Sequence, residues 1–159
     1  MAEELNMQKA KQVYDTAIRT FNNLNWNYEE HKEELVIQSG VKGEDLPIEF
    51  LLVVKPQQEV VQFLSRLPFN MPEDKRVDGA IAVCVANHGM IDGCFDYDLS
   101  DGEIVFKLTS SYRESTLGEE LFQYMIMCSA TMVDRYNDQF FMLAKGMLTI
   151  QQFIEQENA

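Results

Sequence analysis

Five carboxylates lie close together in the middle of the chain, where they could form a calcium site. In order, they are Asp92, Asp96, Asp98, Asp101 and Glu103. An EF-hand loop that began at Asp96 would need glycine at its sixth position and glutamate at its twelfth. These positions hold Asp101 and Lys107, so the calcium motif is not present. In a strand, Asp96 and Asp98 would share one solvent-facing side, which explains the acids without a metal.

Two cysteines and a histidine form a second candidate site, in this case for zinc. Cys84 and His88 are four residues apart on a predicted helix, and Cys94 follows six residues later. A fourth ligand is not evident, and Cys84 lies in the apolar run Ile81–Val85, where a buried thiol is the usual occupant. The three cysteines, which include Cys128, form no Cys-x-x-Cys pair, and this pattern fits a reducing compartment.

No arrangement of residues typical of a catalytic site is evident. Nucleophilic catalysis needs a base beside serine or cysteine, and neither His31 nor His88 lies in a nucleophile motif. We therefore predict a protein that is not an enzyme, with no catalytic residues, no cofactor and no bound metal. The alternative that remains open is a regulatory domain that senses a small ligand or a metal, through the central acids or through Cys84, His88 and Cys94.

One predicted strand and one predicted helix carry more apolar side chains than packing on a core through a single face requires. This excess favours an apolar binding surface. The stretch Ile48–Lys55 alternates like a strand, yet it carries Leu51 and Val53 on its second face. The helix expected after Thr116 is rich in methionine, a flexible side chain that suits varied apolar partners, although core packing is the alternative. The candidate partner-binding residues are Leu51, Val53, Met125, Ile126, Met132 and Val133.

The remaining patterns place these residues on helices and strands. Apolar residues spaced by three and four predict an amphipathic helix over about 5–25. A hairpin is predicted around Ser100-Asp101-Gly102, because Asp-Gly lies between two runs of alternating apolar residues and can adopt the backbone conformation of a tight turn. The three other predicted strands are Leu35–Val41, Ile48–Lys55 and Val60–Leu67, and Trp26–Glu30 is a candidate for a further short strand.

Capping signals predict where the later helices begin and end. Asn70 with Glu73 resembles a capping box for a helix that runs to about Asn87, and Thr116 with Glu119 resembles another. The second helix is expected to break or kink near Asn137-Asp138 and to end at Gly146, and a short helix follows Thr149. The expected buried stripe of the first of these helices consists of Val77, Ala80, Ile81, Cys84 and Val85.

The order of elements predicts an α+β fold. Strands that follow one another through short turns favour an antiparallel sheet with helices packed on one face, in the order α-βββ-α-ββ-α. A length of 159 residues suits a single domain over residues 1–159. The net charge of −13 argues against binding to nucleic acid. Neither a membrane span nor a leader segment is evident, so we expect a cytoplasmic protein that does not bind membranes.

Four motifs follow one another along the chain, which are Leu67–Arg76, Ala86–Gly89 with Gly93 and Phe95, Asp101–Lys107, and Met132–Tyr136. In order and spacing they resemble those of the YbjN-like family of bacterial sensory transduction regulators. The resemblance covers about residues 47–156. The family pattern commonly has an aromatic residue in place of His88, so the resemblance assigns no role to His88. It also commonly has a proline in place of Asn137.

The resemblance implies a fold similar to that of type III secretion chaperones and provides no catalytic residues. It implies turns at Gly89, Gly93 and Gly102, and core positions at Phe95, Ile104, Phe106 and Tyr136. Together with the apolar surface described above, it leads us to expect a chaperone-like or regulatory protein. We expect this protein to form a homodimer and to bind a protein or peptide partner.

Overall fold

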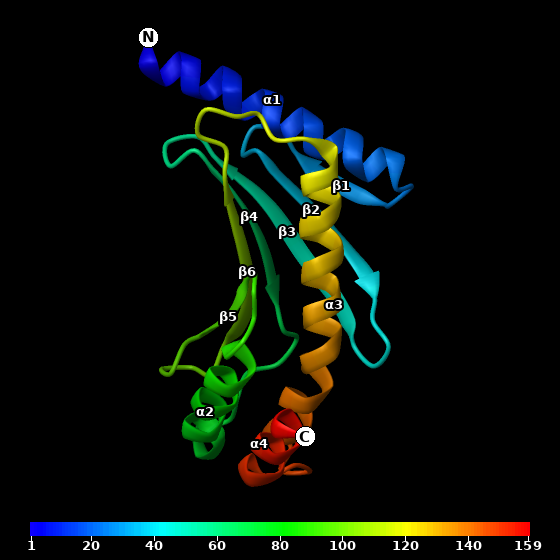
Figure 1. Ribbon diagram of the computed structural model, residues 1–159, viewed down its shortest axis with the longest axis vertical. Helices are drawn as coiled ribbons and strands as arrows, with labels where there is room; N and C mark the ends of the chain where they lie inside the picture. Colours follow the sequence, from blue (N-terminus) through cyan, green and yellow to red (C-terminus); the bar gives the residue numbers. More distant parts are fainter.

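Six antiparallel strands form one twisted sheet, and four α-helices accompany it (Figure 1). The computed structural model describes residues 1–159, and the strand order in the sheet is β1-β2-β3-β4-β6-β5. The elements are α1 (Ala2–Asn23), β1 (Tyr28–His31), β2 (Val36–Lys42), β3 (Pro47–Lys55), β4 (Val60–Arg66), the short 3₁₀ helix η1 (Glu73–Lys75), α2 (Arg76–Asn87), β5 (Cys94–Tyr97), β6 (Ile104–Ser111), α3 (Glu119–Ala144) and α4 (Ile150–Asn158). The predicted α+β class and order of elements are confirmed.

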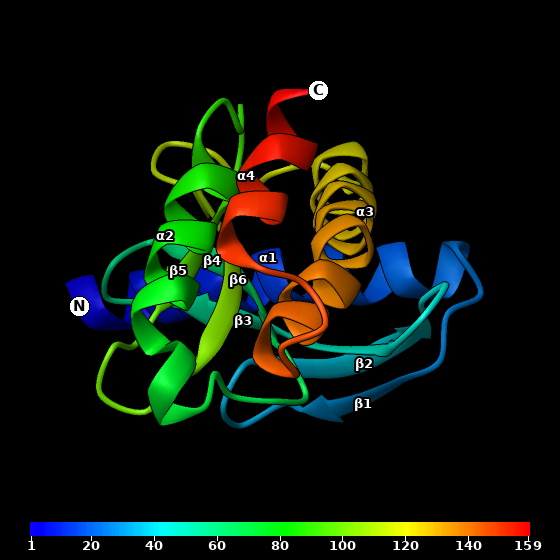
Figure 2. The ribbon, with the colours of Figure 1, turned by 90° about the horizontal axis from the view of Figure 1, so that it is seen from below.

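The helices lie on one side of the sheet, and the core fills the space between the two layers (Figure 2). Strand alternation explains this arrangement, because successive side chains point to opposite faces. In β3, Phe50, Leu52 and Val54 are buried beneath α1 and α3, whereas Leu51 and Val53 point to the other face. The sheet is therefore covered on one face and open on the other.

The free edge of β5 is closed by the side chain of Asn87. The Phe95 backbone N–H donates to Asn87 Oδ1 at 2.7 Å, and Asn87 Nδ2 donates to the Phe95 carbonyl at 2.9 Å. The amide thus replaces a neighbouring strand at this residue and ties the end of α2 to the sheet. Gly89, with φ of 84°, then reverses the chain, which is a conformation that favours glycine.

The hairpin that follows has the predicted turn. The Gly102 N–H donates to the Asp98 carbonyl at 2.8 Å, and Gly102 has a φ of 79°. Phe95 and Phe106 pair across the strands with ring centroids 5.2 Å apart, and both are buried. The core positions implied for Phe95, Ile104, Phe106 and Tyr136 are all confirmed.

The predicted buried stripe of α2 is wrong. Val77, Ile81 and Cys84 are exposed, and the helix instead buries its smaller residues, which are Gly79, Ala82, Val83 and Ala86. Close packing explains the choice, because a Cβ at Gly79 would lie 2.6 Å from Tyr97 Oη. Small side chains let α2 approach the sheet, and the larger apolar residues remain on its outer side.

Two predicted capping boxes are also wrong, and helix α3 does not break at Asn137. Asn70 makes no cap and donates to the Asp101 carbonyl at 3.2 Å, and α3 begins after Gly118 without a side-chain cap from Thr116. Helix α3 runs unbroken through Asn137, whose side chain is buried without a hydrogen bond. Packing of the surrounding core therefore outweighs the local preference for a break. Thr149, by contrast, does form a capping box with Gln152 at the start of α4.

Helices α3 and α4 are joined by a hydrogen bond at the end of the core. Tyr136 Oη donates to Glu157 Oε2 at 2.7 Å. Burial, reinforced by this hydrogen bond, raises the pKa of Tyr136 from 10.0 to about 12. The neutral phenol is therefore the form that stabilises the folded protein.

We predict that Asn87→Ala lowers the free energy of unfolding by about 1–3 kcal/mol, because it leaves the Phe95 N–H and carbonyl without partners. Urea denaturation followed by circular dichroism measures the change. Asn70→Ala, which removes one long and exposed hydrogen bond, is the control and should cost much less. Equal stability of Asn87→Ala and the wild type would contradict the assigned role.

We predict that Tyr136 contributes to a loss of stability at alkaline pH. Its pKa is raised on folding, so its contribution is fully present below pH 10 and is lost as the pH rises through about 12. Tyr136→Phe should therefore show a smaller decrease in unfolding free energy over this range than the wild type. Urea titrations at pH 8 and above pH 10 compare the two proteins, and parallel decreases would refute the prediction.

Candidate functional site

Strands β3 and β4 separate before either strand ends, which opens a groove in the sheet. They pair from Leu51 with Leu64 to Lys55 with Val60. Beyond Leu51, β3 continues to pair only with β2 as far as Pro47, and β4 continues only with β6 as far as Arg66. Continuing the register would place Glu49 opposite Arg66, but the two strands have already moved apart.

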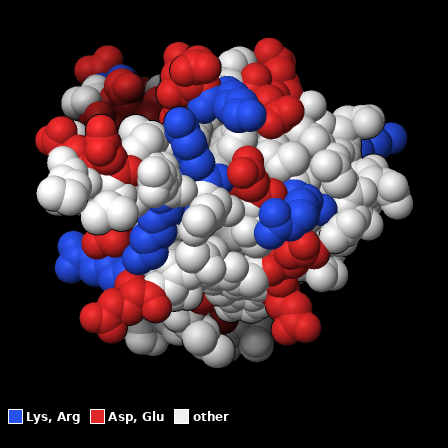
Figure 3. Space-filling view, turned by 90° about the horizontal axis from the view of Figure 1, so that it is seen from above, with Lys and Arg blue, Asp and Glu red and all other residues white.

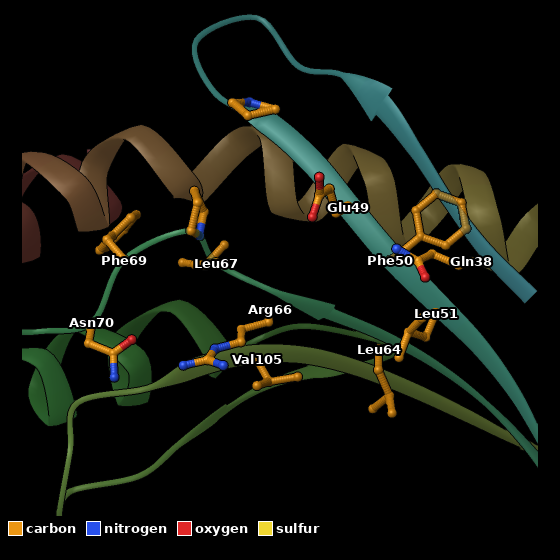
Figure 4. Close-up of a pocket in the computed structure, with 12 residues that line it drawn as sticks. Gln38, Glu49, Phe50, Leu51, Leu64, Arg66, Leu67, Phe69, Asn70 and Val105 are labelled. Atoms are coloured by element: carbon orange, nitrogen blue, oxygen red, sulfur yellow. The ribbon is translucent and has the colours of Figure 1, made fainter. Parts of the chain in front are cut away.

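We call this groove the notch (Figure 4). It has a volume of about 750 Å³ and is open to solvent. Leu51 and Leu64 lie at one end of the notch and Phe69 and Asn70 at the other, with Arg66 and Val105 between them. The buried side chains of Phe50 and Leu67 also line it, so the bottom of the notch reaches the hydrophobic core.

Apolar side chains on the open face continue from the notch across the sheet. Leu51 is 37% exposed and pairs with the half-buried Leu64 on β4. One row along, Val36 pairs with Val53, and both are half-buried. The side chains of such cross-strand pairs lie in contact range, so they form one apolar surface. No element of the chain covers it.

The backbone at the notch retains strand geometry without a complete ladder. Antiparallel residues alternate between the two neighbouring strands in the direction of their N–H and carbonyl groups. The Glu49 carbonyl points toward β4, where it accepts a hydrogen bond from Ser65 Oγ at 2.8 Å. Glu49 and Arg66 therefore direct backbone groups into the gap, where the β3–β4 ladder has already ended.

Charge at the notch is asymmetric. Arg66 Nε is held by Glu103 Oε2 at 2.9 Å, whereas the Glu49 side chain forms no ion pair. A free carboxylate thus borders the notch on a chain whose net charge is −13. On the face seen in Figure 3, acidic and basic side chains are interspersed, and no single sign covers it.

The structure divides the predicted partner-binding residues between two places. Leu51 and Val53 lie on the open face, beside the notch. Met125, Ile126 and Val133 lie in the core and are at most 1% exposed, which is the packing alternative for this helix, and Met132 is half-buried. The three buried residues are therefore not available at the surface of this chain.

The central acids have partners within the hairpin or on adjacent strands. Asp96 forms an ion pair with Lys107 at 3.1 Å, and Asp98 accepts hydrogen bonds from the backbone and side chain of Ser100. These bonds lower the pKa of Asp98. Asp101 accepts a bond from the Glu103 N–H. The acids therefore stabilise the turn and the strands rather than converging on one point.

The proposed zinc ligands do not converge either. Cys84 and His88 are exposed on the outer side of α2, whereas Cys94 pairs with Lys107 in the sheet. No three His, Cys, Asp or Glu side chains are grouped closely enough to hold a metal ion. These residues therefore form no assembled metal site in this structure.

Sequence reasoning missed Glu49, Leu64, Arg66, Phe69 and Val105 as parts of one site. Leu64 and Val105 could have been found, because both are apolar residues at outward positions of their strands. Glu49 and Arg66 carry no comparable signal. Their role depends on the separation of β3 and β4, which no local pattern encodes.

Comparison with known proteins agrees with the observed fold. A model of the YbjN family, described as "Putative bacterial sensory transduction regulator", matches residues 18–142. A similar solved structure is "Crystal structure of YbjN, a putative transcription regulator from E. coli", with a TM-score of 0.57 and 10% identity, covering 77% of this chain and 86% of that chain. At this identity the likeness shows the fold alone. No curated protein matches the chain, and none of its helices combines the length and apolar character of a membrane span.

Two neighbouring leucines provide a test of the open face. We predict that Leu52→Ala, at a fully buried position, lowers the unfolding free energy by about 2–5 kcal/mol. Leu51→Ala, one residue away on the open face, should cost about 1 kcal/mol or less. Urea denaturation of both variants measures the difference, and similar losses would show that the open face is covered in solution.

Proposed function

Because the chain belongs to the YbjN family, we propose that it is a non-enzymatic regulatory protein that binds an extended polypeptide segment in the notch. One observation carries this proposal: the sheet opens between β3 and β4 while apolar side chains remain uncovered beside the gap. The family description as a regulator is consistent with a binding role. The notch supports that role because it is a groove that could hold an extended segment.

Strand geometry supports an extended segment as the occupant. A peptide can add to a sheet when backbone N–H and carbonyl groups of a strand lack a ladder partner. Glu49 on β3 and Arg66 on β4 direct such groups toward the gap. A segment lying along β3 would form hydrogen bonds in the positions where the β3–β4 ladder ends.

Apolar and charged side chains favour a particular kind of segment. Leu51 and Leu64 would contact alternate apolar side chains of the peptide, since a strand presents every second residue to one face. The free Glu49 carboxylate would pair with a lysine or arginine, and the net charge of −13 favours approach of a basic partner. Because Glu49 and Leu51 project from the same face of β3, the proposed ligand is an extended segment that presents apolar residues and a basic residue on one face, at every second position.

Two synthetic peptides test this proposal by fluorescence anisotropy. One carries leucine, valine and lysine at every second position with threonine between them, and the other has glutamate in place of each lysine. We expect the wild type to bind the lysine peptide at least roughly tenfold more tightly than the glutamate peptide, a difference of about 1.4 kcal/mol. Glu49→Lys should remove most of this preference, and Leu51→Ser should weaken binding of the lysine peptide.

Glu29→Lys is the matched control, because it changes the net charge equally but lies on the edge strand β1, two strands away from β3 in the sheet. It should bind the lysine peptide nearly as the wild type does. Equal effects of Glu29→Lys and Glu49→Lys would show a general charge effect and would contradict binding at the notch. Unchanged binding by Leu51→Ser would also contradict it.

A further inference from the structure

Asn137 places a primary amide in the hydrophobic core without a hydrogen bond to the rest of the chain. It lies on α3 and is 1% exposed, and neither its Nδ2 donor nor its Oδ1 acceptor has a partner. Buried amides are normally paired, because water no longer satisfies them. Single buried atoms of Arg76, Ser129 and Gln139 also lack partners, but only Asn137 lacks them for both a donor and an acceptor.

The neighbours of Asn137 on the same helix face place it beneath the notch. Three residues earlier, Asp134 Oδ1 accepts a hydrogen bond at 2.8 Å from the N–H of Glu44, just before β3. Four residues later, the ring of Phe141 packs on Phe69, just after β4, with ring centroids 5.4 Å apart. Residues three and four apart share a helix face. Asn137 therefore lies on the part of α3 that spans the gap between the start of β3 and the end of β4.

Two apolar side chains close the bottom of the notch above this part of α3. Phe50 and Leu67 line the notch and are each 2% exposed. Figure 4 shows α3 crossing behind β3 and behind the segment that carries Leu67 and Phe69. Asn137 does not line the notch of the free protein. An occupant therefore reaches its amide only when the side chain of Phe50 or Leu67 moves aside.

A segment bound in the notch as a strand would direct every second side chain toward α3. Its apolar and basic residues face the open side of the sheet, so the residues between them point through the gap toward the helices. A second primary amide complements Asn137, because it supplies both an acceptor and donors. The chain contains a related pairing at Asn87, whose amide bonds to both backbone groups of Phe95.

We propose that Asn137 is a specificity-determining residue of the notch, which pairs with a glutamine or asparagine side chain of the bound segment. This pairing rests on the proposed binding of a polypeptide in the notch, and it names the residue type that the segment directs toward α3. A leucine in the same place would leave both amide atoms of Asn137 unsatisfied in the core. The amide therefore selects between segments that are otherwise alike.

A peptide scan tests this selectivity by fluorescence anisotropy. Starting from the lysine peptide described above, glutamine replaces each threonine in turn, and a matched set carries leucine at the same positions. At one position we expect the wild type to bind the glutamine peptide at least roughly tenfold more tightly than its leucine counterpart. Asn137→Leu should remove or reverse this preference.

The scan separates this inference from the proposed function. Binding of the lysine peptide at the notch, with no position at which glutamine is preferred to leucine, would overturn the pairing with Asn137 and leave the proposed function standing. Absence of binding by every peptide would overturn both. A glutamine preference that persists in Asn137→Leu would overturn the assignment to Asn137.

The stability of the free variants distinguishes a recognition role from a structural one. Leucine is similar in size to asparagine and removes two unsatisfied groups, so Asn137→Leu should raise the urea midpoint of unfolding. A lower midpoint would show that the amide is already satisfied in the free protein, for instance by an ordered water, and would overturn the proposal. Ser129→Ala removes another buried, unpaired group on α3 and should keep the wild-type glutamine preference.

The side-chain amide signals of Asn137 provide a readout in the wild type that needs no variant of this residue. In protein with isotope-labelled asparagine, NMR should show a shift of the Asn137 side-chain signals and contacts to the peptide glutamine when the preferred peptide binds. The matched leucine peptide should give no such contacts. A bound glutamine peptide without any change in the Asn137 side-chain signals would overturn the proposal.

Discussion

The structure depends on one constraint, which is that its helices cover only one face of a six-stranded sheet. Strand alternation then sorts every second residue into the core and every other residue onto an open face. Phe50 and Leu52 are buried by this rule, and Leu51 and Val53 are left without cover within the chain. The candidate binding surface follows directly from this arrangement.

Backbone groups without a strand partner occur at the β5 edge and at the notch, and they are satisfied to different extents. At the edge of β5, the Asn87 amide satisfies both backbone groups of Phe95 and blocks the addition of another strand at that residue. At the notch, the backbone carbonyl of Glu49 accepts a hydrogen bond from the Ser65 side chain, but the β3–β4 ladder remains incomplete. Edge groups that lack partners are a known route for strand addition. The contrast favours the notch, rather than the β5 edge, as the place where the proposed peptide segment would bind.

The sequence predicts local features well and long-range features poorly. The hairpin at Gly102 and the open-face positions of Leu51 and Val53 follow from alternation and turn chemistry. The buried side of α2 could not be predicted from the sequence, because apolar residues occur on every side of the helix between Gly79 and Ala86. The side that carries Gly79 is buried because α2 packs closely against Tyr97 there. Helix α3 likewise continues through Asn137 because packing in the core, rather than the local preference of asparagine, determines the length of the helix. The notch depends on where β3 leaves β4, which is a property of the whole sheet.

The most direct test of peptide binding in the notch is an NMR titration of labelled protein with the lysine peptide described above. We expect the largest backbone amide shifts to fall on Glu49, Leu51, Leu64 and Arg66, with intermolecular contacts from the peptide to the methyl groups of Leu51 and Leu64. Shifts centred on α2 or α3, with no change at these four residues, would contradict it.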